Sequence, residues 1–409
     1  MLDRVTIGRM CAWAAGKPIL LALSGGGDSV AMLHLLVAEL GVGQVRAAIV
    51  DHALREGSPA AAARAKAFAE ALGVRAEILT LSWPAGSNRA QQAAREARYR
   101  ALCDYARREN LNTIATAHTA DDQAETVMMR AANGSTWRGL AGIAPFASPP
   151  LWPEGRGIAL ARPLLGARRA ELRLYLHERG APWIEDAANA DPTYERVRVR
   201  QRMGALEAEG FDPAQLARLA TRLRGKAAAL DRAALDLIER AAKLDLTIAI
   251  KRSEWIGSDG VRQRALSVLI AAAAGAAREP TGVEKIERRV MSLDHRGSTY
   301  WGVEFAPTKA GIELRREPGA ALGRADGAPG LAPLPLSAGV EAIWDGRIAI
   351  TALEPGWRVV PAPNRELAAF EKDAVRKRYR EAGVAMQLRP LAAERVAHAF
   401  APDINRAKP

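Results

Sequence analysis

Five short apolar runs alternate with helical patterns through the first half of the chain. The apolar runs lie at 18–24, 45–52, 75–83, 112–118 and 157–165. The helical patterns that follow them lie at 30–40, 59–72, 88–109, 121–133 and 169–179. Parallel strands need crossover helices and are covered on both faces, so they are typically unbroken apolar runs. The pattern predicts an α/β fold with a doubly wound, mainly parallel five-stranded sheet that binds ligands at the carboxyl ends of its strands.

The second half of the chain has a different pattern. A long helix rich in Ala and Arg is expected at 212–244, then a strand at 246–250, helices at 262–273 and 282–292, and a hairpin of 299–305 with 311–316. The segment 318–335 is rich in Gly, Pro and Ala, which is typical of a linker. A strand is expected at 347–353 and a helix at 373–382. We predict a first domain at 1–205, a mainly helical domain at 206–317, a linker at 318–335 and a small α+β domain at 336–409.

The composition is that of an ordinary soluble protein, with 49% hydrophobic and 25% charged residues among 409. No run approaches the roughly 18–20 apolar residues of a membrane span. The N-terminal stretch lacks the apolar core and cleavage site of a signal peptide. Cys11 and Cys103 form no CxxC motif, which argues against a disulfide framework or a cysteine-ligated metal cluster. We therefore expect a cytoplasmic protein with no membrane partner.

The chain is strongly basic, with a formal net charge of +12 and a pI of about 10.1. An excess of positive charge favours an anionic partner, and nucleic acid is the commonest large one. The alternative is a compositional bias, because a chain this rich in Ala and Arg is also typical of a high-GC genome. Charge alone leaves both explanations open.

A glycine-rich loop joins the first predicted strand to the first predicted helix. Its residues are Ser24, Gly25, Gly26, Gly27, Asp28 and Ser29. Backbone N–H groups at a helix N-terminus are unpaired, and glycines let an anion approach them closely, so the loop is expected to hold a phosphate. The alternative is a plain tight turn with Ser29 as the helix cap. The loop is neither a Walker-type loop, which needs a Lys before its Ser or Thr, nor a GxGxxG motif.

This string resembles the PP-loop, SGGxDS, of the N-type ATP pyrophosphatases, which split ATP between its α and β phosphates. The resemblance implies an adenine nucleotide alpha hydrolase-like catalytic domain at 1–205 whose loop holds the pyrophosphate portion of ATP. An aspartate beside phosphates would repel them unless a cation intervened. We therefore expect Asp28 to contact a Mg²⁺ ion that bridges to the phosphates.

Four further stretches narrow the resemblance. They are VDHALR at 50–55, QQAAREARYRAL at 91–102, ATAHTADDQAETVMMR at 115–130 and WIEDAANADPTYERVRVR at 183–200. Together they are similar to the tRNA(Ile)-lysidine synthetase family. This resemblance implies that ATP adenylates the C2 oxygen of the wobble cytidine in the CAU anticodon of tRNA(Ile). Free L-lysine then attacks C2 through its ε-amine and expels AMP. The sequence does not determine whether the protein forms a homodimer.

The expected catalytic residues are Asp28, Arg98, Asp122 and Glu125. Asp122 and Glu125 are three apart on a predicted helix and so share a face, where two carboxylates can bind an ammonium and accept its proton. The resemblance implies that they recognise lysine. The alternative is that both are first-turn residues favoured by the helix dipole. By resemblance Arg98 stabilises the charge that develops during adenylyl transfer; the alternative is one more exposed charge on its helix.

Strand ends supply the other expected ATP contacts. Asp51, His52 and Arg55 follow the second predicted strand, and His118 ends the fourth. Three positions depart from the family pattern: Thr119 stands where a second His is usual, Asn133 where an Arg is usual, and Val197 where an Asn is usual. The flanking Arg196 and Arg200 are four apart and are expected to contact a phosphate of ATP or tRNA.

A basic run at 372–383 resembles the basic helix with which the family's C-terminal domain binds the tRNA acceptor end. Its candidate tRNA contacts are Arg376, Lys377 and Arg378. The alternative is that these charges simply form a solvent-exposed surface.

Two other functions remain possible for the chain. A tRNA thiolase generally uses paired cysteines or an iron–sulfur cluster, and a catalytically silent tRNA-binding protein would keep only the ATP fold.

Overall fold

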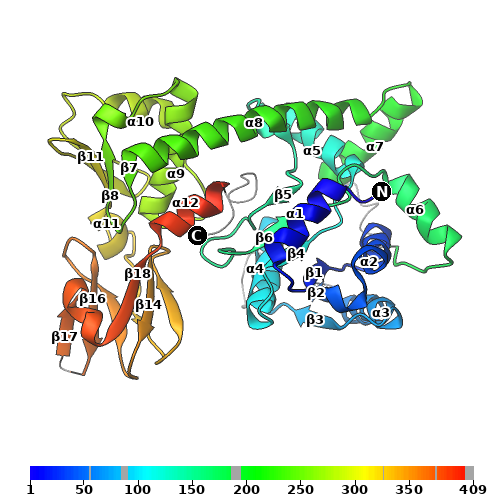
Figure 1. Ribbon diagram of the computed structural model, residues 1–409, viewed down its shortest axis with the longest axis horizontal. Helices are drawn as coiled ribbons and strands as arrows, with labels where there is room; N and C mark the ends of the chain where they lie inside the picture. Colours follow the sequence, from blue (N-terminus) through cyan, green and yellow to red (C-terminus); the bar gives the residue numbers. More distant parts are fainter. Residues whose placement is uncertain (55–56, 84–90, 186–194, 326, 374, 401–409) are drawn as a thin grey trace. The chain divides into compact units, whose positions relative to one another are not determined.

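The computed structural model describes residues 1–400 except 55–56, 84–90, 186–194, 326 and 374 (Figure 1). The described chain forms two compact units. One unit spans Met1–Ala228, and the other starts at Ala229. The predicted domain boundaries stay predictions. Among the helices described, none is both long and apolar enough to cross a lipid bilayer.

A six-stranded sheet forms the centre of the first unit, in the order β3-β2-β1-β4-β6-β5. The strands are β1 (Ile19–Ala22), β2 (Val45–Asp51), β3 (Ala76–Thr80), β4 (Thr113–Ala115), β5 (Phe146–Ala147) and β6 (Ala159–Ala161). The five predicted strands pair in parallel, which confirms the expected α/β class. The two-residue β5 pairs antiparallel with β6 and was not predicted, because so short a strand leaves no periodic pattern.

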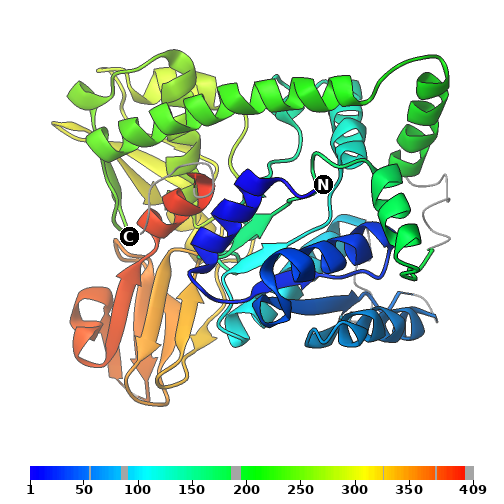
Figure 2. The ribbon, with the colours of Figure 1, turned by 45° about the vertical axis from the view of Figure 1, so that its right-hand side comes forward.

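Helices cover both faces of this sheet. They are α1 (Arg4–Ala14), α2 (Gly27–Leu40), α3 (Ser58–Ala71), α4 (Gln91–Arg108), α5 (Ala120–Ala132), α6 (Arg169–Glu178) and α7 (Glu195–Ala208), with short 3₁₀ turns η1 (Val42–Gln44) and η2 (Gly139–Ala141). Helices of the first unit lie on the two sides of the sheet (Figure 2). Along β1, Ile19 and Leu21 pack into a core with α1, α2, α3 and α6, whereas Leu20 packs on the other face with α4. This two-sided burial explains why β1 is an unbroken apolar run.

The second unit contains three antiparallel sheets. One has the order β7-β8-β11-β10-β9, from β7 (Ala242–Lys243), β8 (Ile248–Lys251), β9 (Ser298–Tyr300), β10 (Val303–Pro307) and β11 (Gly311–Arg316). Another joins β12 (Leu334–Pro335), β15 (Arg358–Pro361), β16 (Ala368–Lys372) and β17 (Val375–Arg378). The third joins β13 (Glu341–Trp344), β14 (Ile348–Ala352) and β18 (Met386–Pro390).

The helices of this part of the chain begin with α8 (Ala214–Ala241), which runs from the first unit into the second. The others are η4 (Arg252–Glu254), α9 (Asp259–Ala274), α10 (Val283–Val290), α11 (Pro318–Leu322), η5 (Tyr379–Val384) and α12 (Ala392–Phe400). The expected linker at 318–335 contains α11 and β12, and Ala321 within it is fully buried.

Two local predictions in the second unit are wrong. The stretch 299–305 was expected to be one strand, but Trp301 and Gly302 turn it at φ angles of +55° and +75° and divide it into β9 and β10. The stretch 373–382 was expected to be a helix. Instead β17 pairs with β16 and η5 follows it, because the ladder to β16 decides the conformation of a charged run with little helical pattern of its own.

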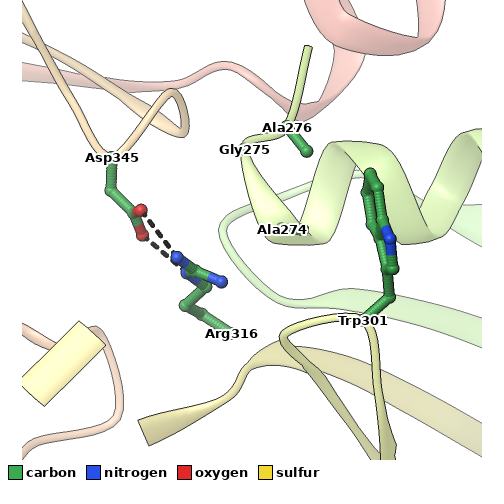
Figure 3. Close-up of a pocket in the computed structure, with 6 residues that line it drawn as sticks. All are labelled: Ala274, Gly275, Ala276, Trp301, Arg316 and Asp345. Atoms are coloured by element: carbon green, nitrogen blue, oxygen red, sulfur yellow. Dashed lines mark hydrogen bonds and ion pairs between the residues drawn. The ribbon is translucent and has the colours of Figure 1, made fainter. Parts of the chain in front are cut away.

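A cavity of about 400 Å³ lies in the second unit (Figure 3). It is lined by Ala274, Gly275, Ala276, Trp301, Arg316 and Asp345. Arg316 makes a two-point ion pair with Asp345, at 3.0 and 3.1 Å. A Cβ on Gly275 would lie 1.9 Å from the Asp345 carbonyl oxygen, so a glycine is needed at this position. The charged groups of the cavity are therefore already paired with each other.

Candidate functional site

The glycine loop, residues 24–29, leads from β1 into α2. The helix begins at Gly27 with Gly26 as its N-cap, and no described side chain caps its first turn. The Ser29 hydroxyl instead donates to the Gly26 carbonyl at 2.8 Å and accepts from the Ser24 amide at 3.2 Å, which closes the loop. Uncapped N–H groups and the positive end of the helix dipole favour an anion. The loop thus has the backbone geometry that a phosphate group needs.

Two of the loop glycines leave room for neighbouring side chains, and one of them also has a left-handed backbone conformation. Gly25 has φ +81°, and a Cβ there would lie 2.7 Å from Cδ1 of Ile184. The Ile184 amide also donates to the Gly25 carbonyl at 2.9 Å. At Gly27 a Cβ would lie 1.5 Å from Nη1 of Arg173. The Arg173 guanidinium therefore lies against the backbone of the loop.

Sequence reasoning missed Arg173, which is on α6. Its Nη1 is buried without a hydrogen-bond partner among the described residues, although the Glu185 carboxylate lies 3.7 Å away. Its guanidinium also stacks over the Trp183 ring, 5.0 Å from the centroid. A buried cationic donor beside this loop is suited to a phosphate oxygen. In the sequence Arg173 is one of several arginines on the same predicted helix, so no local signal distinguishes it.

Asp28 has one satisfied and one unsatisfied carboxylate oxygen. Oδ2 accepts from Nε of Arg169 at 3.2 Å, whereas Oδ1 is buried and has no hydrogen-bond partner in the described structure. Burial raises the pKa of Asp28, and Asp122 raises it further, against the lowering effect of Arg169 and Arg173. An orphaned buried oxygen of this kind fits a metal ligand. No group of three or more His, Cys, Asp or Glu in the described residues could hold a metal ion, so such an ion would need phosphate oxygens as well.

Asp122 and Glu125 lie in the first two turns of α5. The Asp122 side chain forms a capping box with Thr119, whose amide donates to Oδ2 at 2.8 Å. The hydroxyl of Thr119 caps the helix in return, which gives a structural reason for a threonine where the family usually has histidine. Both acidic residues are buried. Asp122 therefore has a structural role besides any role toward a ligand.

One arginine contacts all three acidic residues of the site. Arg169 donates to Asp28 at 3.2 Å, to Oδ1 of Asp122 at 2.9 Å and to Oε1 of Glu125 at 3.1 Å. Burial alone would lower the pKa of Arg169, but the three carboxylates outweigh it and raise it. Sequence reasoning missed this residue. Its only signal was its position at the start of the helix predicted at 169–179.

Two further arginines reach the same acidic pair from α7. Arg196 donates to Glu125 at 2.9 Å and to Asp122 at 3.2 Å, and Arg200 donates to Glu125 at 2.9 Å. Both were expected to face a phosphate. In this structure they contact carboxylates, and their spacing of four residues places both on one side of the helix, as expected.

The predicted ATP contacts at the strand ends differ in their surroundings. Asp51 ends β2 and is buried. Its side chain accepts a hydrogen bond from the Ala53 amide at 2.9 Å, which stabilises the turn after the strand. Nδ1 of His52 is buried without a described hydrogen-bond partner, and burial together with Arg98 lowers the pKa of His52 against the effect of Asp51. Arg55 lies outside the described residues.

His118 follows β4 and is hydrogen-bonded to a neighbouring side chain. Its Nδ1 lies 2.9 Å from Oγ1 of Thr116. Burial, reinforced by Arg162, Arg98 and other arginines, lowers the pKa of His118 well below its ordinary value. Burial also lowers the pKa of Arg98. Arg98 acts on both His52 and His118, so the structure gathers these three predicted residues into one electropositive region.

The basic run of the C-terminal part lies on β17, in the second unit. Arg376 lies 3.6 Å from Glu371, and Lys377 lies over the Trp357 ring at 5.7 Å. Arg376 and Arg378 are exposed and Lys377 is half-buried. Exposed arginines on a strand are free of the core and able to contact a phosphate backbone, which keeps the tRNA contact a prediction.

The chain is similar to several known proteins. A family model described as a PP-loop domain matches residues 5–207. The tRNA(Ile)-lysidine synthase of Hyphomonas neptunium is 35% identical over 309 residues, which cover 74% of this chain and 82% of that protein. The enzyme of the same name from Methylobacterium nodulans is 40% identical over 281 residues, 67% of this chain and 80% of its own. Among solved structures, a U34-tRNA thiolase from Methanococcus maripaludis has a TM-score of 0.42 at 18% identity and covers 54% of this chain and 78% of its own.

Proposed function

The chain belongs to the tRNA(Ile)-lysidine synthase family, and on this premise we propose how its residues carry out the reaction. The protein is a ligase that uses ATP to form lysidine on tRNA(Ile). The finer steps are proposals. ATP transfers its adenylyl group to the C2 oxygen of the wobble cytidine of a CAU anticodon and releases diphosphate, and free L-lysine then displaces AMP. We also propose that Mg²⁺ accompanies ATP and that the reaction takes place in the cytoplasm.

One observation carries the assignment of the site. The Arg169 guanidinium touches Asp28 of the glycine loop and both members of the acidic pair on α5. A single side chain spans only a few ångströms, so the phosphate loop and the acidic pair meet at one point. Lysidine formation needs this arrangement, because the amine must reach the carbon whose oxygen has just received the adenylyl group.

We assign the diphosphate portion of ATP to residues 24–29, with Arg173 as an additional phosphate contact. Asp28 would hold Mg²⁺ through its unpartnered Oδ1; the ion would neutralise phosphate charge during bond cleavage. Asp122 and Glu125 bind the lysine ammonium and take its proton, since only the neutral amine is nucleophilic. Arg98 stabilises the charge that develops on the α-phosphate during adenylyl transfer, and His52 and His118 beside it contact ATP.

The direct test supplies the protein with ¹⁴C-lysine, ATP and an unmodified tRNA(Ile) transcript that carries the CAU anticodon. We expect one lysine to enter each tRNA, with release of AMP. The matched control is the same transcript with uridine in place of the wobble cytidine, which should receive no lysine. ATP and tRNA binding without incorporation would support the catalytically silent binding protein instead.

The cysteines distinguish this function from a thiolase. Burial raises the pKa of the Cys103 thiol to about 12, and burial and Glu39 raise the pKa of the exposed Cys11. A thiol with a raised pKa has little thiolate and is a poor nucleophile or metal ligand. We expect the double variant Cys11→Ser, Cys103→Ala to retain lysine incorporation within about twofold of wild type. Loss of incorporation in a variant with unchanged thermal unfolding would show that a cysteine takes part in the reaction.

A further inference from the structure

The acidic pair on α5 is almost saturated with hydrogen bonds from the protein itself. Within the described structure, Asp122 accepts two at Oδ2 from Thr119, and one each at Oδ1 from Arg169 and Arg196. Glu125 accepts three, from Arg169, Arg196 and Arg200. A carboxylate offers about four acceptor positions. The pair therefore has room for roughly one more hydrogen bond, whereas an ammonium group needs to donate three.

The arginines of this cluster fall into two kinds. Arg169 is fixed from several sides, because its backbone amide also donates to Asp121 at 2.7 Å and its side chain is 20% exposed. Arg196 and Arg200 come from α7 and are more exposed, at 34% and 37% of the side chain. Together these two donate three hydrogen bonds to the acidic pair. Their withdrawal would free the same number of acceptor positions that an ammonium requires.

The charges favour the same exchange. The carboxylates of Asp28, Asp122 and Glu125 pair with three guanidinium groups. Arg173 adds a further positive charge beside Asp28, so the cluster has no excess of negative charge without any ligand. Adding an ammonium to this cluster would leave an excess of positive charge. A triphosphate on the adjacent glycine loop brings several negative charges, and guanidinium groups bind phosphate oxygens in a two-point geometry. Nucleotide therefore gives the α7 arginines an alternative partner close by.

We propose that Arg196 and Arg200 cover the lysine site in the nucleotide-free protein and turn to the phosphates when ATP binds, so that lysine binds after ATP. This inference rests on the proposed function for the identity of the amino acid and of its site. It assigns the two arginines a second task besides phosphate contact. The protein would thereby admit lysine only when ATP is in place to activate the base.

Ordered binding has a measurable consequence. When only a fraction of the protein has an open site, the apparent affinity for a ligand falls by that fraction. We expect Mg²⁺ with a non-hydrolysable ATP analogue to tighten lysine binding at least about tenfold over protein alone. The double variant Arg196→Ala, Arg200→Ala should bind lysine about tenfold more tightly than wild type when nucleotide is absent.

Equilibrium dialysis with ¹⁴C-lysine tests both expectations. The control is Arg202→Ala, an exposed arginine on the same helix, which should behave as wild type. Equal lysine affinity with and without the analogue, or no gain in the double variant, overturns the exchange. If the double variant fails to fold, the wild-type comparison with and without nucleotide still decides. Lysine incorporation by wild type, measured in parallel, reports separately on the proposed function: incorporation without nucleotide-dependent binding overturns the exchange alone.

Discussion

Replacing Asp28 by asparagine is expected to lower lysine incorporation at least about a hundredfold. Asparagine keeps the shape of the side chain and one oxygen but loses the charge that would hold a cation beside the phosphates. The unpartnered Oδ1 of Asp28 has no other task in the described structure, so the loss should fall on the ATP-dependent step. Single-turnover lysine incorporation measures the effect, and filter binding of tRNA should stay close to wild type.

The stability of the same variant provides the control. The pKa of Asp28 is raised by burial, so the folded protein binds this proton more tightly than the unfolded chain does. Stability is then lost as pH rises from the unfolded pKa through the raised folded pKa, because the charged form is disfavoured by burial. Asparagine removes that cost, and the variant should unfold at a temperature equal to or above that of wild type at neutral pH. Near-normal turnover in Asp28→Asn would refute the role given to this residue.

Replacing Glu125 by glutamine is expected to lower kcat/KM for lysine by about tenfold to a hundredfold, which corresponds to the loss of charged hydrogen bonds. Glutamine also lacks the basicity to accept the ammonium proton. The side chain of Glu125 is only 3% exposed, so water has little access to its carboxylate. The apparent affinity for ATP should change much less, because the glycine loop is unaltered.

Steady-state kinetics with lysine and ATP varied separately test this expectation. Glu195→Gln is a matched control, since Glu195 is an exposed glutamate at the start of α7. A variant whose defect lies entirely in the KM for ATP would show that Glu125 serves the nucleotide and not the amino acid. Alanine is a poorer choice at this position, because it would leave three guanidinium groups facing an uncharged methyl group.

Local sequence predicted the first unit well and the second less well, for one reason. A parallel strand such as β1 is buried on both faces, and a crossover helix follows it. Its hydrophobic pattern is therefore visible in consecutive residues of the sequence. The conformation of β17 depends on its pairing with β16, and that of 299–305 on a turn at Trp301 and Gly302. The hydrophobic patterns of these segments are weak, so contacts with distant residues determine their secondary structure.

The sequence by itself determined the parallel sheet, the glycine loop and the acidic pair, because each is a property of neighbouring residues along one strand, turn or helix face. Only the tertiary structure decided which cations complete the site. Arg169 and Arg173 are ordinary arginines in a chain that contains many, and their roles follow from where α6 packs against the loop and α5. Charges act through space, and a sequence records only their order along the chain.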